Sequence, residues 1–219
     1  MDAVREAVML QKYSFSAFMI AMFLALASTT VFAAEQKLLP AIEPGEDGMY
    51  NQPWFYESFL DLAEDITEST KAGKRVVIIF EQRGCPYCKE MHMVNLRRPK
   101  IVNYIKKNFN VIKMDLWGAR EVTDFDGQKL PEKKFARKYG VQFTPTMIFL
   151  PDSPKGLKVK HPRDREAFRI FGYWKPFHFL NSFVYVKTNG YKKQPSFQRW
   201  LSAHAEELRA KGEDVKLWE

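Results

Sequence analysis

The sequence predicts an α/β fold in which helices cover both faces of a central sheet. One observation is a continuous run of β-branched and aromatic side chains at residues 75–80, which is typical of a strand buried on both faces. A second is the alternation of strand-like and helix-like segments along the rest of the chain, without an internal repeat. The third is size: 219 residues with 46% hydrophobic content suit one well-cored domain with extensions.

The N-terminus has the composition of an export signal. An apolar run at residues 17–27 follows basic side chains, and Val31 and Ala33 occupy the small-residue positions that a signal peptidase reads. We therefore assign residues 1–33 to a signal peptide cleaved after Ala33. The alternative is an uncleaved membrane anchor, because the run is borderline in length for a span. Export of a chain with a lone cysteine pair favours an oxidising compartment, and the leader implies the periplasm.

Charge is distributed unevenly after the leader. Residues 34–70 carry nine acids and one base, whereas residues 71–219 carry 31 bases and 15 acids, within a net charge of +8. The first part of the acidic stretch, residues 34–52, is rich in Pro and Gly and is predicted to be a linker before a domain over residues 53–219. Because the basic residues are scattered among acids in an exported chain, we expect a solvated basic surface and no nucleic-acid partner.

Hydrophobic periodicity and the positions of Gly and Pro predict the helices and strands of the domain. Apolar residues recur at helical spacing from Pro53 to Ile66, and the strand at 75–80 follows. The later predicted elements are helices at 89–96 and 101–107, a strand at 111–116, a helix at 132–139, strands at 146–150 and 167–173, and helices at 176–186 and 197–210. Residues 117–130 and 151–165 are polar and are predicted to be loops.

The two cysteines of the chain lie in one motif, Cys85-Pro86-Tyr87-Cys88, directly after the buried strand. At this spacing the pair can close and reopen a small disulfide, and the positive end of the following helix is expected to stabilise a Cys85 thiolate. Pro86 suits the first helical turn, where its missing N–H would have no partner anyway. A redox pair is therefore the favoured interpretation, and half of a metal site is the alternative.

The chain resembles thioredoxin-fold proteins in four features. These are the strand leading into the cysteine motif, the helix behind it, Thr144-Pro145-Thr146 opening the next strand, and Gly172-Tyr173 before the last core helix. The resemblance implies a thioredoxin fold over a core of about residues 53–190, with a central mixed sheet of four to five strands and helices on both faces, and a further helix at about 197–210. It also implies a cis Thr144–Pro145 bond and main-chain pairing of Thr144 with substrate.

More closely, the chain is similar to the SoxW-type periplasmic thioredoxin-related proteins. The matching stretches are 80–91, 122–127, 143–146, 172–176 and 195–198. This resemblance implies an exported thiol–disulfide oxidoreductase that acts on protein disulfides. It further implies re-reduction by a membrane electron-donor protein of the CcdA or DsbD type and, in some lineages, a link to sulfur metabolism.

The chain departs from ordinary thioredoxin at the buried acid of the central strand. That position is Ile79 here, and the nearest carboxylate is Glu81, on the same side of the strand. Glu81 is therefore a candidate for proton transfer, and a charge at the surface end of the strand is the alternative.

A metal site at the cysteines would need further ligands. His92 lies four residues after Cys88 and would give the cysteines a third soft ligand, but no fourth is evident. We expect His92 on the helix surface, no metal and no cofactor.

The residues predict thiol–disulfide exchange but do not by themselves decide whether the protein reduces or oxidises its partners. In the expected mechanism Cys85 attacks a disulfide and Cys88 resolves the mixed disulfide. Thr144 before the proline resembles exported reductases more than strong oxidants, which favours a periplasmic reductase. The alternatives are a DsbA-like disulfide-forming oxidant and a non-enzymatic partner-binding module. The oligomeric state and the physiological substrate do not follow from the sequence.

Overall fold

The computed structural model describes residues 37–216, which belong to one compact unit. The predicted signal peptide, residues 1–33, lies outside the described residues. Within the described range, no helix has the length and apolar character needed to cross a bilayer.

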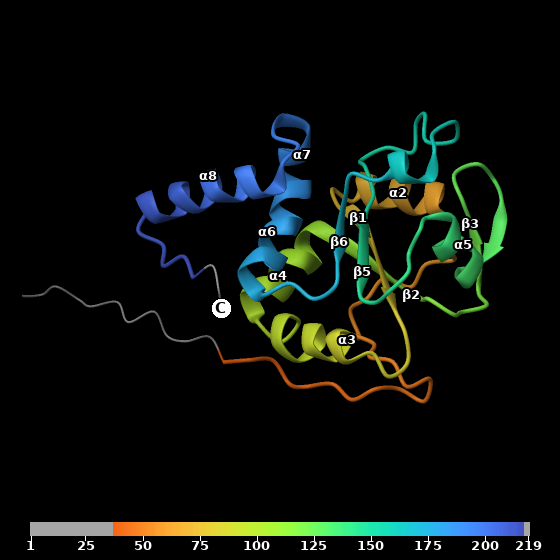
Figure 1. Ribbon diagram of the computed structural model, residues 1–219, viewed down its shortest axis with the longest axis horizontal. Coiled ribbons are helices and arrows are strands. Elements are labelled where there is room, and N and C mark those ends of the chain that lie inside the picture. Colours follow the sequence, from red (N-terminus) through yellow and green to blue (C-terminus); the bar gives the residue numbers. More distant parts are fainter. Residues whose placement is uncertain (1–36, 217–219) are drawn as a thin grey trace, which may run out of the picture. The chain divides into compact units, whose positions relative to one another are not determined.

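The central sheet has four strands in the order β2-β1-β5-β6 (Figure 1). Strand β1 (Arg75–Glu81) pairs in parallel with β2 (Phe109–Asp115) and antiparallel with β5 (Thr146–Phe149), which in turn pairs antiparallel with β6 (Phe168–Phe171). Every residue of β1 is buried, as its continuous apolar run predicts. The mixed sheet predicted from the sequence is confirmed.

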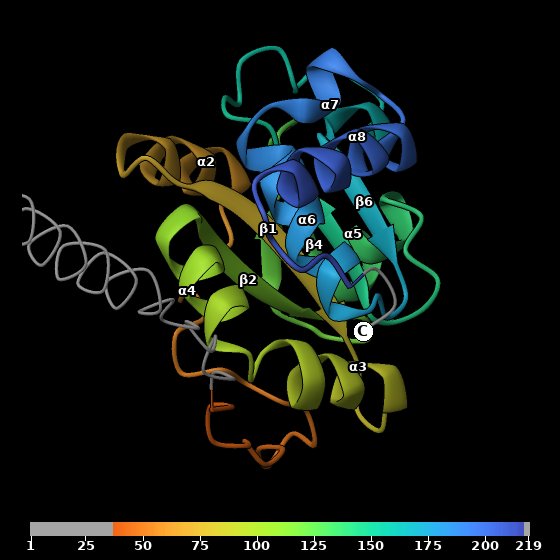
Figure 2. The same ribbon diagram turned by 90° about the vertical axis from the view of Figure 1, so that its left-hand side faces the viewer.

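Helices cover both faces of this sheet. On one face α2 (Leu62–Lys71) and α5 (Glu132–Lys138) pack on β1 side chains such as Ile78 and Phe80. On the other face lie α4 (Pro99–Asn108), α6 (Pro176–Lys187) and α8 (Phe197–Ala210), which Figure 2 turns toward the viewer. The short helices are α3 (Pro86–Glu90), continued by the π-helix η1 (Met91–Asn95), the 3₁₀-helix η2 (Pro162–Arg165) and α7 (Gly190–Lys193).

The first helix begins later than the periodicity predicts. It starts at Leu62, because the Asp61 carboxylate caps it by accepting from the main-chain N–H groups of the next turn. Upstream, the Ser58 hydroxyl bonds the Leu60 N–H and the Asp65 carboxylate, which holds this stretch in a turn. Phe59, expected on the apolar face of a helix, is instead fully exposed.

Residues 117–130, predicted to be a loop, contain most of a two-stranded hairpin. Its strands are β3 (Glu121–Thr123) and β4 (Lys129–Pro131), and the hairpin leads directly into α5. The loop predicted at 151–165 likewise contains η2. Both elements are only three or four residues long, too short for the hydrophobic pattern to reveal them.

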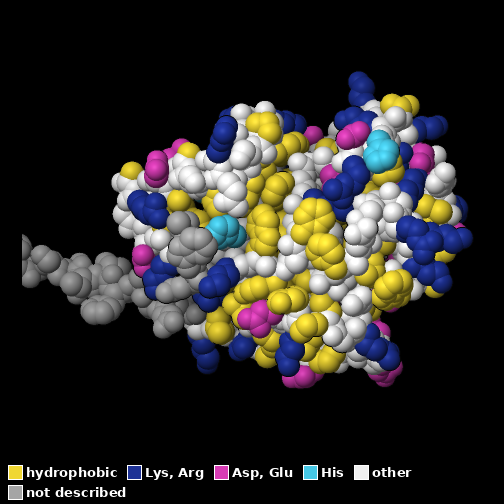
Figure 3. Space-filling model, viewed as in Figure 1, with side chains coloured by type: hydrophobic (Ala, Val, Ile, Leu, Met, Phe, Trp, Pro, Cys, Tyr) yellow, Lys and Arg dark blue, Asp and Glu magenta, His cyan; other side chains and the backbone are white. Residues whose placement is uncertain are grey.

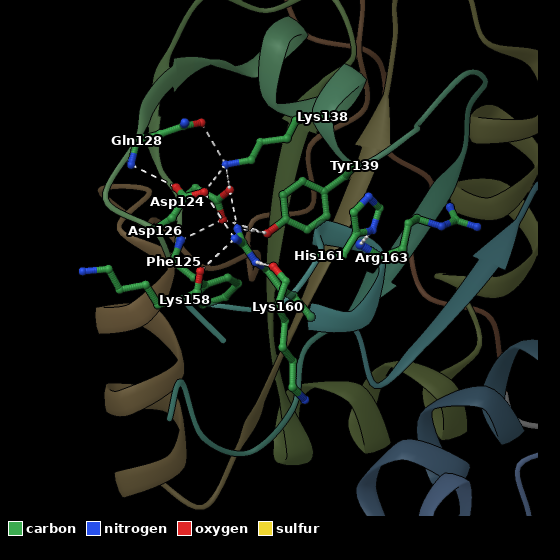
Figure 4. A network of polar contacts seen from close by, with 11 residues as sticks. Asp124, Phe125, Asp126, Gln128, Lys138, Tyr139, Lys158, Lys160, His161 and Arg163 are labelled. Atoms are coloured by element: carbon green, nitrogen blue, oxygen red, sulfur yellow. Dashed lines mark hydrogen bonds and ion pairs between the residues drawn. The ribbon is translucent and has the colours of Figure 1, made fainter. Parts of the chain in front are cut away.

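A buried polar network ties these two segments to the end of α5 (Figure 4). The Asp124 carboxylate accepts from the Tyr139 hydroxyl at 2.7 Å and from Arg165 Nη1 at 2.8 Å. Arg165 also donates to Asp126 and to the main-chain oxygens of Lys158 and Lys160. Because α5 leads into the loop at 140–145, this network fixes the base of that loop.

The segment predicted as a linker is described from residue 37 on, and it runs along the domain. Leu39 N–H donates to the Arg97 carbonyl, while Arg97 Nε donates back to the Leu39 carbonyl. Further along, Tyr56 N–H donates to the Val111 carbonyl on β2. These bonds position residues 37–56 beside the end of η1 and along the outer edge of β2.

Candidate active site

The cysteine motif sits where β1 ends and α3 begins. Gly84, with a φ of 72°, makes the turn, and Cys85 is the N-cap of α3. Cys85 and Cys88 form a disulfide with their Cα atoms 5.3 Å apart, and the Cys88 N–H donates to Cys85 Sγ. Cys85 keeps 7% of its surface exposed and Cys88 only 1%, which is the order expected for an attacking and a resolving thiol. Between them Pro86 begins the helix and Tyr87 is exposed.

The Thr144–Pro145 bond is cis, as the resemblance implies. It lies directly before β5, and Thr146 of β5 pairs with Phe80 near the end of β1. The cis-proline loop and the cysteine motif therefore meet at the same end of the sheet. The Pro145 carbonyl accepts from Gly172 N–H at 2.9 Å, whereas the main-chain groups of Thr144 have no hydrogen-bond partner within residues 37–216. Thr144 thus offers a free donor and acceptor beside the dithiol.

Glu81 is not a surface charge. Its side chain is 1% exposed, and Oε1 lies 2.9 Å from Nε2 of His92, which is itself fully buried. The expectation that His92 lies on the helix surface is therefore wrong. Its burial follows from the N-terminal segment: Gln52 bonds the ring at 3.2 Å, and Tyr50 stacks on it with centroids 5.2 Å apart.

The hydrogen bonds fix the form of the His92 ring. The Gln52 amide nitrogen is a donor, so Nδ1 accepts and carries no proton. Nε2 then carries the ring proton and donates it to Glu81. The position of thioredoxin's buried acid is filled by Ile79, which is 1% exposed and packs in the core. The buried acid that precedes this dithiol in the chain is therefore Glu81, four residues before Cys85 and paired with a histidine from the segment that continues the active-site helix.

The sequence contained one signal for this pairing. His92 is four residues after Cys88 on a continuous helical segment, so a buried Cys88 indicates a buried His92. Among the described residues, no group of three or more Cys, His, Asp or Glu is placed to hold a metal ion. The two charges flanking the cysteines, Arg83 and Lys89, are exposed, and Arg83 Nε donates to the Asp47 carbonyl at 2.9 Å.

Exposed aromatic side chains surround this end of the sheet. Tyr87 lies within the cysteine motif, and Phe143 directly precedes Thr144. Trp117 follows β2, and its indole N–H donates to the Gln82 side chain at 2.9 Å. Phe171 ends β6, opposite Thr146. We call these four residues the aromatic rim.

Comparison with known proteins assigns the chain to a family. A family model described as thioredoxin-like domain matches residues 62–187, more than half of the chain. No curated protein matches it. Among solved structures, the chain is similar to a thioredoxin-fold protein from Helicobacter pylori, with 19% identity, a TM-score of 0.47, and coverage of 66% of this chain and 92% of that one.

Two further solved structures are similar to the chain, a thioredoxin and a domain of DsbD. A thioredoxin from Thermus thermophilus is 26% identical, with a TM-score of 0.42 and coverage of 57% of this chain and 83% of that one. The oxidised C-terminal domain of Neisseria meningitidis DsbD is 18% identical, with a TM-score of 0.39 and coverage of 57% and 91%. The match of the family model, together with the disulfide-linked pair at the head of α3, shows that the chain belongs to the thioredoxin-like domain family and is a thiol–disulfide oxidoreductase.

Proposed function

We propose that this protein is an exported, periplasmic dithiol reductase that exchanges disulfides with protein partners through Cys85 and Cys88. The observation that carries the proposal is the position of the pair, at the start of a helix and at the same sheet end as the cis Thr144–Pro145 loop. The Cys85 thiolate attacks a partner disulfide, forming a mixed disulfide and expelling one partner thiolate. Cys88 then attacks Cys85 Sγ, closing the intramolecular disulfide and releasing the second thiolate.

Main-chain recognition supports a protein substrate. The unpartnered N–H and carbonyl of Thr144 can pair with an extended segment on either side of its cysteine, as a short β-ladder does. Tyr87 and Pro86, exposed between the cysteines, border the same surface. A non-enzymatic binding module would have no need of a closed Cys85–Cys88 pair beside this loop.

Regeneration requires two electrons, and we propose that a membrane electron-donor protein of the CcdA or DsbD type supplies them. SoxW-like sequence stretches, including residues 80–91, support this donor and a place in sulfur metabolism. The DsbA-like oxidant remains the alternative function. Equilibration of the purified protein with a glutathione redox buffer distinguishes the two: a reductase has a potential near that of thioredoxin, about −270 mV, whereas a value near −120 mV would establish the oxidant.

We also propose that Glu81 receives the proton that Cys88 loses when it attacks the mixed disulfide, with His92 holding the carboxylate in place. Burial supports this role, because Glu81 is an enclosed carboxylate at the end of the strand that leads into the cysteine motif, and its 2.9 Å contact with His92 fixes its position. The transfer leaves Cys88 as the thiolate nucleophile and Glu81 neutral until the product disulfide forms.

Trapping tests the exchange function in cells. Cys88→Ser leaves Cys85 able to attack but removes the resolving thiol, so mixed disulfides accumulate on Cys85. We expect partner proteins and the electron donor among the trapped species, and none with Cys85→Ser Cys88→Ser as the matched control. If Cys88→Ser captures no more than the double variant, the exchange function is wrong.

N-terminal sequencing of the exported protein tests the proposed cleavage of the signal peptide, with Ala34 as the expected first residue.

A further inference from the structure

The aromatic rim has a cationic side that the exchange mechanism does not use. Phe143 and Phe171 lie next to each other, with ring centroids 5.7 Å apart. Two guanidinium groups lie over the Phe171 ring, Arg163 at 5.8 Å and Arg169 at 5.6 Å from its centroid. Figure 3 shows hydrophobic side chains gathered over the region of β6, with Lys and Arg side chains beside them. The rim is therefore apolar and positively charged at its β6 side.

The two arginines differ in their surroundings. The Arg169 side chain is 6% exposed. It donates hydrogen bonds to the Glu166 carboxylate from Nε, at 2.8 Å, and from Nη2. Nη2 also donates to the Tyr139 carbonyl, but Nη1 is buried without a hydrogen-bond partner. Arg169 is thus a buried cation that is largely engaged by its own neighbours, which leaves Arg163 as the cation open to a ligand.

Arg163 is exposed and is the outer cation of the pair. Within residues 37–216 no carboxylate forms an ion pair with it, although Asp164 is its neighbour in the chain. Figure 4 shows its side chain directed away from the Asp124 network, which engages Arg165 instead. The nearby acid Glu166 is already bound to Arg169. Arg163 is thus held over an aromatic ring at the rim, with no direct ion pair within residues 37–216 and only a longer-range interaction with the Glu166 carboxylate.

We propose that this side of the rim selects partner segments that carry an acidic side chain near the reactive cysteine. The proposal rests on the exchange function proposed above and names its substrate class: an extended, cysteine-bearing acidic peptide. The segment pairs with Thr144, lays an apolar side chain on Phe143 and Phe171, and brings a carboxylate to Arg163. The basic character of residues 71–219 supports the same partner charge through long-range attraction.

Short peptide disulfides test this selectivity directly. Each probe is a symmetric disulfide of one peptide with a single cysteine and a phenylalanine, flanked on both sides by Glu, Gln or Lys. Reduction by the dithiol form of the protein turns each probe into two peptide thiols as Cys85 and Cys88 become a disulfide. We expect the second-order rate constant for the Glu probe to exceed that for the Lys probe about fivefold at low ionic strength, with less difference in high salt.

Substitutions test whether the difference in rate between the Glu and Lys probes arises at Arg163. Arg163→Gln should abolish most of the difference between the Glu and Lys probes, whereas Arg163→Lys should retain it. Arg199→Gln on α8 is the matched control, because it removes the same charge from an exposed arginine outside the rim and should leave the difference intact. Equal loss in Arg163→Gln and Arg199→Gln would overturn the site in favour of net charge.

Failure of this inference is distinguishable from failure of the exchange function. If the protein reduces bis(2-hydroxyethyl) disulfide and the Gln probe but treats Glu and Lys probes alike, the acidic-partner inference is wrong and the exchange function stands. If it reduces neither the small disulfide nor any peptide, both are wrong.

Discussion

His92 Nε2 lies 2.9 Å from Glu81 Oε1, joining the end of β1 to the helix that carries the dithiol. Both side chains are buried, and both lie within four residues of a cysteine. The pair therefore links the two elements that must stay fixed while the disulfide opens and closes. It also connects a buried carboxylate to the helical segment that carries the resolving Cys88.

Glu81→Gln should slow the resolving step while leaving the first attack unchanged. The variant keeps the size of the side chain but loses the proton acceptor, and proton transfer of this kind typically contributes about 10²–10⁴-fold, so we expect a loss of about 10²-fold. Stopped-flow measurement separates formation of the mixed disulfide from its resolution. The difference should close in alkaline solution, where Cys88 loses its proton to solvent. Glu206→Gln on α8 is the control, and an unaltered resolving rate in Glu81→Gln would show that the pair is only structural.

The His92 ring should carry its proton on Nε2. Gln52→Met removes the donor to Nδ1 and leaves a buried nitrogen without a partner, so the free energy of unfolding should fall by about 1–3 kcal/mol. Nitrogen chemical shifts in labelled protein report the tautomer directly. An Nδ1–H tautomer in the unmodified protein would mean that the Gln52 amide is reversed.

Asp65→Asn should stabilise the protein at neutral pH. Burial, opposed by the Ser58 hydrogen bond and reinforced by nearby acids, raises the pKa of Asp65 to about 6. Because the folded-state pKa is raised, ionisation of Asp65 costs stability as pH rises from about 4 through 6. We expect the variant to gain about 1–2 kcal/mol at pH 7 in urea unfolding and nothing at pH 3, after allowance for the lost interaction with the α2 N-terminus. A gain that does not depend on pH would contradict this account.

Asp126→Asn should have the opposite pH dependence. Burial alone would raise the pKa of Asp126, but hydrogen bonds from Lys138, the Gln128 main chain and Arg165 lower it to about 2. The stabilisation is therefore present above pH 4 and is lost as pH falls toward 2. The variant should lose about 1–2 kcal/mol at pH 7, with the loss shrinking as the pH is lowered below 4 in the same unfolding assay. An equal loss of unfolding free energy at pH 7 and pH 3 would show that the ionised Asp126 carboxylate is not its cause.

The fold and the reactive motif were predictable because local patterns encode them. The apolar run of β1, the cysteine spacing and the Thr144–Pro145 dipeptide each specify their structure within a few residues. Phe59 shows where periodicity fails, since the Asp61 cap decides the helix start and leaves that ring in solvent. Helical spacing placed it in the core, but a local hydrogen bond outweighed the pattern.

The burial of the Glu81–His92 pair could not be read from the sequence in the same way. Its cover comes from Tyr50 and Gln52, some forty residues earlier and in a segment without regular secondary structure. The aromatic rim likewise combines residues from four separate segments of the chain at one end of the sheet. Tertiary contacts of this kind have no periodic signature.

The hydrogen bond from Tyr56 N–H to the Val111 carbonyl has a consequence for any shortened form of this protein. β2 is the outermost strand on its side of the sheet, and the segment before α2 shields part of its free edge. A protein trimmed to residues 62–216 would retain the dithiol and every helix from α2 to α8 but expose that edge to strands of other molecules. It should self-associate in light scattering at concentrations where the chain from residue 37 on stays monodisperse, so the irregular N-terminal segment acts as a guard against aggregation.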